Sequence, residues 1–122
     1  MKKVALVTGA SVGIGRGIAK ALAAEGVRVA VSARRVDKLE ELANDIVAAG
    51  GQRPVIIESD LYPEDAAAKL AAAAMTGLGR VDILVNNAGG SRSFKDLHVS
   101  EAQWQEAITL NFHRPRQVAD AL

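Results

Sequence analysis

The stretch that decides the fold is Thr8-Gly9-Ala10-Ser11-Val12-Gly13-Ile14-Gly15. It follows the short apolar run Val4–Thr8 and precedes a segment whose apolar residues recur at helical spacing. Glycines between a strand and a helix let the main chain approach a phosphate, and the start of the helix offers unpaired N–H groups with a partial positive charge. The stretch therefore predicts a phosphate-binding turn. The alternative is a glycine-rich turn that serves only tight packing.

Short apolar runs alternate with longer amphipathic segments along the rest of the chain. The runs are nearly continuous, as in parallel strands covered on both faces, and predict strands at residues 4–8, 27–32, 54–58 and 81–86. Two apolar stripes at helical spacing lie between them: Ile14, Ile18, Ala21 and Leu22, then Leu39, Leu42, Ala43, Ile46 and Val47. We predict an α/β fold of the Rossmann type, a doubly wound parallel sheet of about four strands in the order 3-2-1-4 with flanking helices.

Polar residues and glycines predict where the helices begin and end. Asp37 and Glu40 have the spacing of a capping box, and the glycines at 50 and 51 would end that helix. Residues 63–65, Pro-Glu-Asp, suit the first turn of the third helix. We therefore expect the second and third helices to begin near Asp37 and near residue 63.

A final helix is predicted to begin at Ser100, where Gln103 completes a capping box, and to run to the end of the sequence. Apolar residues recur on it at i, i+4 and i+8: Trp104, Ile108 and Phe112. They serve either the core or a partner, and the sequence leaves both open. Arg114 and Arg116 are interpreted as a solvated face of this helix.

Charge and composition exclude several function classes. The 15 Lys and Arg nearly balance the 14 Asp and Glu, so we expect neither nucleic acid nor a membrane as a partner. The chain has no Cys, which excludes disulfides and thiolate metal sites and favours the cytoplasm. His98 and His113 are too few to predict a metal site. A chain of 122 residues predicts a single domain, residues 1–122.

The fourth predicted strand would lie at the edge of the sheet with no strand after it. Its hydrogen-bonding groups would be unpaired on one side, and Ile83, Leu84 and Val85 would be partly exposed. We therefore expect the domain to be incomplete at its carboxyl end. The bare strand also predicts self-association or poor solubility unless a partner covers it.

Three further motifs occur at spacings that fit the glycine stretch. Asp60-Leu61 follows the third strand, Asn86-Asn87-Ala88-Gly89 follows the fourth, and Asn111 lies in the final helix. Together with the glycines, these motifs resemble the short-chain dehydrogenase/reductase family over residues 3–122. The resemblance implies a dinucleotide cofactor held by ten residues: Gly9, Ser11, Gly13, Ile14, Gly15, Asp60, Leu61, Asn87, Ala88 and Gly89.

The end of the second strand indicates which dinucleotide would bind. An acid about twenty residues after the glycines would accept the ribose 2′-hydroxyl of NAD, whereas Arg suits the 2′-phosphate of NADP. Here Ala33 takes the acidic position and Arg34 follows it, so we predict NADP as the cofactor over NAD. Val12 stands where the family has a second basic residue. The alternative is that Arg34 and Arg35 are a solvated loop.

The family's catalytic signature is incomplete in this chain. Tyr62 is the only Tyr, and Ala66 stands four residues later, so no Tyr-x-x-x-Lys is present and Tyr62 is not the expected acid. Asn111 is the one catalytic residue that the resemblance carries over, as the holder of a water in the proton relay through its backbone carbonyl. Pro115 lacks the N–H that would normally bond this carbonyl, and it should also kink the helix.

The resemblance implies an NADP(H)-dependent oxidoreductase that transfers hydride between nicotinamide and a small carbonyl or alcohol substrate, and a homo-oligomer is expected. The chain alone, which lacks the Tyr and Lys, is expected to be inactive. A second hypothesis is a non-catalytic nucleotide-binding or interaction module. A third, an unrelated Rossmann protein such as a methyltransferase, is disfavoured by Asn111 together with residues 86–89.

Overall fold

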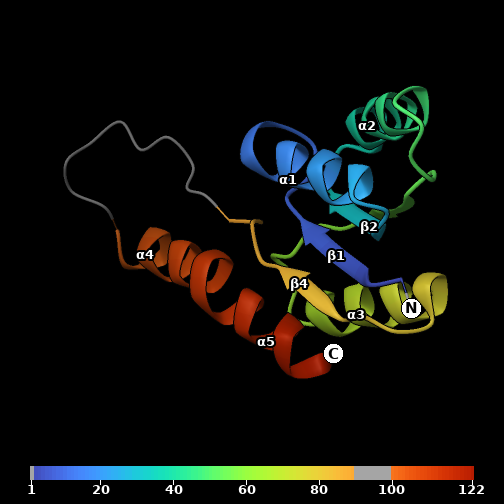
Figure 1. Cartoon of the computed structure of the whole chain (residues 1–122). Helices are drawn as coiled ribbons and strands as arrows, with labels where there is room; N and C mark the ends of the chain where they lie inside the picture. The colour runs from blue at the N-terminus through green and yellow to red at the C-terminus, as the bar shows by residue number, and fades with distance from the viewer. Residues whose placement is uncertain (1, 90–99) are drawn as a thin grey trace.

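The computed structural model describes residues 2–89 and 100–122. Strands and helices alternate in the first part (Figure 1): β1 Val4–Thr8, α1 Gly13–Ala24, β2 Arg28–Ala33, α2 Val36–Ala48, β3 Val55–Glu58, α3 Ala66–Leu78 and β4 Ile83–Val85. One long helical segment forms the second part: α4 Glu101–Ile108, the π-helical turn η1 Thr109–His113, and α5 Arg114–Ala121. The α/β prediction is confirmed.

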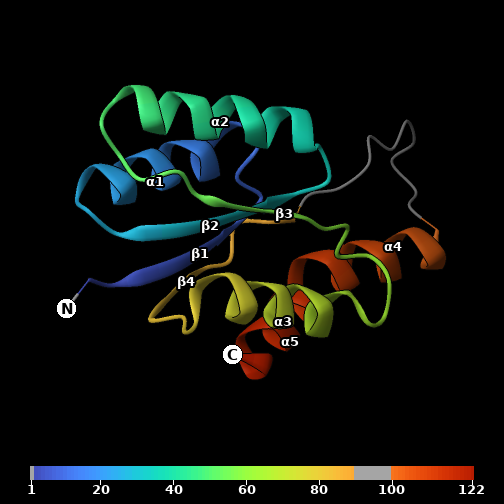
Figure 2. The same cartoon turned by 90° about the vertical axis from the view of Figure 1, so that its right-hand side faces the viewer.

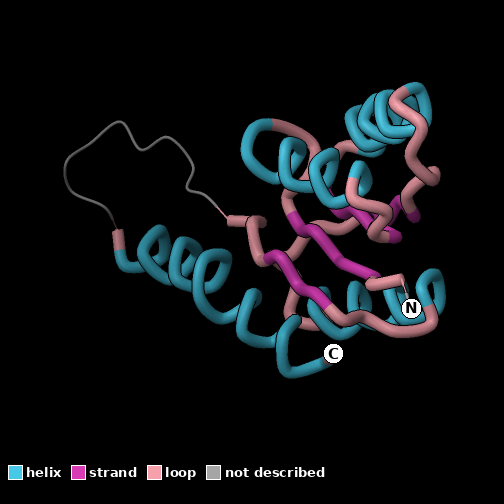
Figure 3. The backbone as a smooth tube through the Cα atoms, viewed as in Figure 1, coloured by secondary structure: helices cyan, strands magenta, loops and turns pink. Residues whose placement is uncertain are grey.

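The strands of the described residues form one parallel sheet in the order β3-β2-β1-β4 (Figure 3). Val7 of the central strand β1 is paired with Val31 of β2 on one side and with Val85 of β4 on the other. Consecutive parallel strands need a crossover helix between them, which is why α1, α2 and α3 separate the strands in sequence. The predicted Rossmann strand order is therefore correct.

Helices cover both faces of the sheet, as Figure 2 shows: α1 and α2 lie on one face, and α3 and α5 on the other. Neighbouring residues of a strand point to opposite faces, so Leu6 belongs to the core beneath α3 and α5, whereas Val7 belongs to the core beneath α1 and α2. Both side chains are fully buried. This two-sided burial explains why the strands read as continuous apolar runs.

The buried face of α1 differs from the predicted stripe. Gly15, Ala19 and Ala23 are buried at i, i+4 and i+8, whereas Ile14 and Ala21 are exposed. Small residues on the inner face let the helix lie close to the sheet. In α2 the predicted stripe is right except for Val47, which is exposed.

Several predicted boundaries need correction. The capping box of Asp37 and Glu40 is wrong, because α2 begins at Val36 and these carboxylates pair with Arg35 at 2.7 Å and with Arg53 at 2.6 Å. Residues 63–65 form a turn before α3, not its first helical turn. The second strand lies one residue later than predicted, the third begins one residue later, and the fourth is shorter, Ile83–Val85.

The final helical segment begins as predicted. The Ser100 hydroxyl accepts the Gln103 N–H, and the Gln103 side chain accepts the Ser100 N–H at 2.8 Å. α4 projects beyond the sheet (Figure 1), and its stripe is exposed, to 56% at Trp104. Ile108 and Phe112 are exposed as well, so the stripe does not belong to the core of the described residues.

β4 lies at an edge of the described sheet and pairs only with β1 there. Its residues Ile83, Leu84 and Val85 are half-buried, as predicted. Among the helices of the described residues, none combines the length and the apolar character that crossing a membrane requires.

Candidate dinucleotide-binding site

The loops after β1 and β4 are joined by the buried hydroxyl of Thr8. Its Oγ1 accepts the backbone N–H of Asn87 at 3.0 Å and of Ala88 at 2.9 Å, and donates to the carbonyl of Val85 at 3.4 Å. The ends of neighbouring parallel strands lie at one edge of a sheet, so a single side chain can connect them. Thr8 thereby fixes the glycine stretch against residues 86–89.

The backbone of Gly9 lies directly against this second loop. Its φ is +64°, and a Cβ there would lie 2.9 Å from the Cα of Ala88. The Asn87 amide donates to the Gly9 carbonyl at 3.0 Å, and a Cβ on Gly15 would come within 2.5 Å of the same amide nitrogen. No side chain fits between the two loops at these positions, so both glycines are required by space, and Gly9 also by its conformation.

The first turn of α1 is left open to an anion. Its capping residue, Val12, makes no side-chain hydrogen bond to the helix, and the first turn contains no acidic residue. The first N–H groups of a helix have no partner within it and carry a partial positive charge. Ser11 is half-buried beside this turn, and Ile14 is 75% exposed at its rim. An anionic group such as a diphosphate fits this position.

The end of β2 presents two arginines with different surroundings. Arg35 is held by Asp37 through two hydrogen bonds of 2.7 and 3.2 Å, and this side-chain bonding lowers the pKa of Asp37. Arg34 is exposed and makes no hydrogen bond or ion pair within residues 2–89 and 100–122. Ala33 beside it introduces no carboxylate. Arg34 is thus available to an external anion.

The loop after β3 turns at Asp60. The backbone N–H of Tyr62 donates to Oδ1 of Asp60 at 3.0 Å, and the Ser59 N–H donates to the Ala33 carbonyl at 2.9 Å. Asp60 is exposed, whereas the Leu61 side chain is buried in the core beneath α3 and α5. Leu61 therefore anchors the loop from below, and Asp60 is the residue that reaches its surface.

Asn111 lies in η1 next to Gly89. A Cβ on Gly89 would come within 2.5 Å of the Asn111 Oδ1, while the Asn111 amide donates to the Ala107 carbonyl at 2.8 Å. The Arg114 N–H bonds the Thr109 carbonyl, five residues back, immediately before Pro115. Pro115 lacks an N–H, and the regular α-helical pairing just before it is replaced by a π-helical turn.

The interpretation of Arg114 as a solvated residue is wrong. The residue is only 9% exposed, and its side chain donates to the Leu61 and Tyr62 carbonyls. The Leu61 carbonyl is buried and needs a partner, and the guanidinium provides it while also binding the partly buried Tyr62 carbonyl. Arg116 is exposed and pairs with Asp120 at 3.5 Å, as expected for a solvated face.

Comparisons with known proteins agree with this geometry. The family model described as short chain dehydrogenase matches residues 3–122. The chain belongs to the short-chain dehydrogenase family. A family relative, a 3-oxoacyl-(acyl-carrier-protein) reductase of Staphylococcus epidermidis, is 39% identical over 112 residues, 91% of this chain and 46% of the reductase. The chain spans 42% to 46% of the length of three curated relatives that it matches, and 29% of a fourth.

Two solved structures resemble the chain closely. A metagenomic short-chain oxidoreductase in complex with NADP is 41% identical, with a TM-score of 0.89 over 98% of this chain and 54% of that one. An alcohol dehydrogenase from the archaeon Thermococcus sibiricus, complexed with 5-hydroxy-NADP, is 32% identical, with a TM-score of 0.89 over 99% of this chain and 52% of that one. The shared fold extends over nearly all of this chain.

The structure brings most of the predicted site residues of this chain to one edge of the sheet. Gly9 and Gly15 lie against residues 87 and 88, and Gly89 lies against Asn111. Arg34 and Asp60 follow the adjacent strands β2 and β3. His98, from the predicted absence of a metal site, lies outside the described residues.

Sequence reasoning missed three residues that hold the site together: Thr8, Asn86 and Arg114. The Asn86 amide donates to the Pro115 carbonyl at 3.1 Å and so ties the end of β4 to α5. Thr8 begins the glycine stretch and Asn86 begins the motif at residues 86–89, so their positions in these motifs could have indicated a role in the site. Arg114 gave none, because an arginine in a polar helix has the same pattern whether it is buried or solvated.

Proposed function

We propose that this chain is the cofactor-binding part of an NADP(H)-dependent oxidoreductase that interconverts a carbonyl and an alcohol. The observation that carries the proposal is the contact between Gly9 and residues 87 and 88 at the open start of α1. Ligands of open parallel sheets bind at the carboxyl ends of the strands, where these loops meet. The NADP complexes of two structural relatives support the choice of cofactor.

Each part of the dinucleotide has a candidate partner. Gly13, Ser11 and Ile14 would lie along the diphosphate, together with Gly9 and Gly15. The remaining partners would be Arg34 for the 2′-phosphate, Asp60 for the adenine amine, with Leu61 supporting its loop, and Asn87, Ala88 and Gly89 beneath the ribose. The bound nicotinamide would supply or accept the hydride. These residues fit a dinucleotide for two reasons. The glycines expose the backbone at the start of α1, where a diphosphate can approach it, and Arg34 supplies a cation for the 2′-phosphate.

Asn111 is the proposed contribution of this chain to proton transfer. It lies against Gly89, and its helix is fixed to the end of β4 by Asn86. We propose that it holds a water of the proton relay. Because the 122 residues contain no Tyr-x-x-x-Lys, the chain by itself lacks the expected proton donor, whose general acid help is worth roughly 10²–10⁴-fold.

Titration of the purified chain with NADP and with NAD at one salt concentration tests the proposal. NADP is expected to bind more tightly, because a 2′-phosphate gains the Arg34 guanidinium whereas a 2′-hydroxyl finds no acid at Ala33. Equal or tighter binding of NAD would overturn the choice of cofactor. Binding of neither would overturn the site.

A non-catalytic nucleotide-binding module is the second candidate, and the missing Tyr-x-x-x-Lys favours it. Both candidates predict NADPH binding without turnover by these 122 residues, so oxidation of NADPH across a carbonyl panel would contradict both for this chain. The coding sequence after Leu122 separates them. A Ser and an in-frame Tyr-x-x-x-Lys would support the enzyme, and a stop codon would support the module. In either case the exposed stripe Trp104, Ile108 and Phe112 is the proposed contact for a homo-oligomer.

A further inference from the structure

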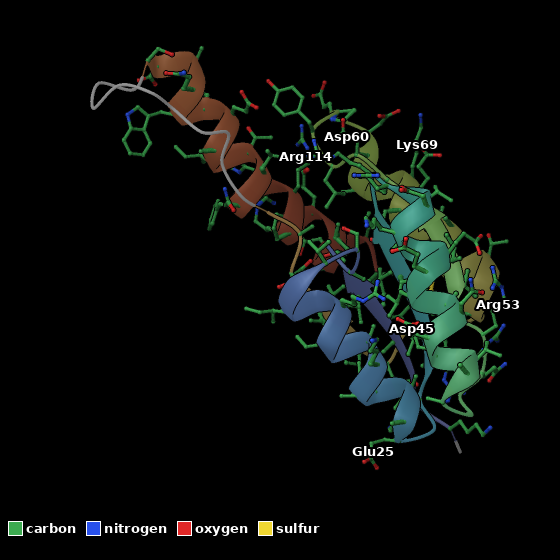
Figure 4. All side chains as sticks on the ribbon, turned by 90° about the horizontal axis from the view of Figure 1, so that it is seen from above. Glu25, Asp45, Arg53, Asp60, Lys69 and Arg114 are labelled. Carbon is green, nitrogen blue, oxygen red and sulfur yellow. The ribbon has the colours of Figure 1, made fainter. Side chains whose placement is uncertain are left out.

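Arg114 is a buried cation that binds a loop more than fifty residues away in the sequence. Its Nε donates to the Leu61 carbonyl at 2.8 Å, and its Nη2 donates to the Tyr62 carbonyl at 2.8 Å. Its Nη1 donates to the Gln117 Oε1 at 2.9 Å. Within the described residues it has no carboxylate partner. The guanidinium therefore binds backbone carbonyls, and Figure 4 shows it next to the loop that carries Asp60.

The two carbonyls belong to the segment that orients Asp60. The Tyr62 N–H donates to the Asp60 Oδ1, so the position of this peptide determines where the carboxylate of Asp60 points. The sheet fixes the near end of the loop, because the Ser59 N–H bonds the Ala33 carbonyl. Arg114 fixes the far end. Without it, the two carbonyls would lose their buried partner and the Asp60 turn would lose its support.

Arg114 also connects this loop to the helix that carries Asn111. It stands three residues after Asn111, directly at the end of η1. One side chain therefore connects the adenine side of the proposed site with the helix that reaches towards the reacting end. The planar guanidinium has several donors in a fixed arrangement and can hold two adjacent carbonyls at once, whereas a lysine ammonium acts as a point charge.

We propose that Arg114 is a positioning residue for cofactor binding, which holds the loop of Asp60 in the shape that recognises adenine. The inference rests on the proposed function, because it assigns Arg114 to the same site. It acts through Asp60 and touches no cofactor itself. The loop would then be set before the cofactor arrives, and binding would not have to order it.

The test compares Arg114→Gln with Arg116→Gln, a matched loss of charge on the exposed side of the same helix. The probe is adenosine 2′,5′-bisphosphate, which carries the adenine, the ribose and the 2′- and 5′-phosphates of the adenosine half of NADP but no nicotinamide. We expect Arg114→Gln to weaken its binding about tenfold and Arg116→Gln to leave it within twofold, since hydrogen bonds from a charged donor are among the stronger ones. Arg114→Lys should restore part of the affinity.

Amide exchange distinguishes positioning from general destabilisation. In Arg114→Gln the Tyr62 amide, bonded to Asp60, should exchange about tenfold faster. The Asn87 and Ala88 amides, bonded to Thr8, should keep the wild-type rate. If all three accelerate together, the residue is merely structural and the inference fails. Gln117→Ala, which leaves Arg114 in place, is the milder variant if Arg114→Gln does not fold, and it should weaken binding about threefold.

The outcomes for the two proposals are separable. If the wild-type chain binds neither NADP nor the bisphosphate, the proposed function fails and this inference fails with it. If the wild type binds and Arg114→Gln binds equally well, only the role of Arg114 is overturned.

Discussion

The hydroxyl oxygen of Thr8 accepts the backbone N–H of Ala88 at 2.9 Å across 80 positions of sequence. The same oxygen accepts the N–H of Asn87, so one buried side chain satisfies two donors of the loop after β4. Buried donors without a partner are costly, which makes this contact a condition for the close approach of the two loops. The proposed phosphate site thus depends on a residue that need not contact a cofactor.

Thr8→Val tests this dependence. The substitution keeps the shape of the side chain but removes its oxygen, so the N–H groups of Asn87 and Ala88 lose their acceptor. The free energy of unfolding, measured in urea, should fall by about 1–3 kcal/mol. Thr8→Ser keeps the hydroxyl and should lose less stability. Equal losses in the two variants would show that the methyl group matters as much as the hydrogen bonds, and no loss in Thr8→Val would contradict the role of the hydroxyl.

Gly9→Ala should be strongly damaging, because both the conformation of the residue and its contact with the second loop exclude a side chain. The residue has a φ of +64°, which costs an L-residue about 1–2 kcal/mol, and the new Cβ would lie 2.9 Å from the backbone of Ala88. We expect loss of NADP binding and a lower free energy of unfolding.

Gly17→Ala is the matched control for Gly9→Ala. Gly17 lies inside α1, a Cβ there meets nothing within 4 Å, and Ala is the better helix former, so stability should rise by about 0.5–1 kcal/mol. A loss of stability at Gly17 similar to that at Gly9 would contradict the geometric argument. Chemical denaturation of both variants measures the difference.

Much of the fold could be predicted from the sequence, because strands that are buried on both faces appear in it as continuous apolar runs. β1 was predicted with its observed bounds, Val4–Thr8, and the strand order followed from the crossover rule. The inner face of α1 was not predicted, because Gly and Ala have a weak apolar signal. The exposed Ile14 has a stronger one and shifted the predicted stripe. Spacing alone cannot show that the sheet requires small residues there.

The site was predictable only where its residues belong to a local motif. The glycines and residues 87–89 stand in such motifs, and the structure brings them into contact. Arg114 binds carbonyls that are distant in the sequence. These acceptors are main-chain oxygens, which every residue has, so the residue type does not indicate them. Tertiary contacts to backbone therefore escape sequence reasoning, even when the side chain that makes them is charged.

Arg34→Ala should shift the choice of cofactor. If Arg34 binds the 2′-phosphate, its loss should weaken NADP binding about 10- to 100-fold and leave NAD binding nearly unchanged. Ala33→Asp should act in the same direction, since a carboxylate repels the phosphate and accepts the 2′-hydroxyl. Calorimetric titration with both dinucleotides measures the ratio.

Arg35→Ala is the control for Arg34→Ala, because it removes an equal charge from the next position. Arg35 is already paired with Asp37 at 2.7 Å, so its loss should change NADP affinity little. If Arg35→Ala weakens NADP binding as much as Arg34→Ala does, the effect is a general one of charge and the assignment of the 2′-phosphate to Arg34 is wrong.

Asp82→Asn should reduce the acid sensitivity of the fold. The Val4 N–H donates to the Asp82 carboxylate at 2.9 Å, and this bond, followed by that from Arg80, lowers the pKa of Asp82 from its ordinary value of 3.8. The unfolded chain therefore takes up the proton more readily than the folded one. The carboxylate stabilises the fold above pH 3.8 and loses this effect as the pH falls through the lowered pKa.

Urea unfolding between about pH 6 and pH 3 should show the wild type losing stability more steeply than Asp82→Asn, with the difference between the two disappearing in acid. Glu25→Gln, an equal change of charge at an exposed residue, should keep the wild-type slope, and parallel curves for the wild type and Asp82→Asn would refute the assignment.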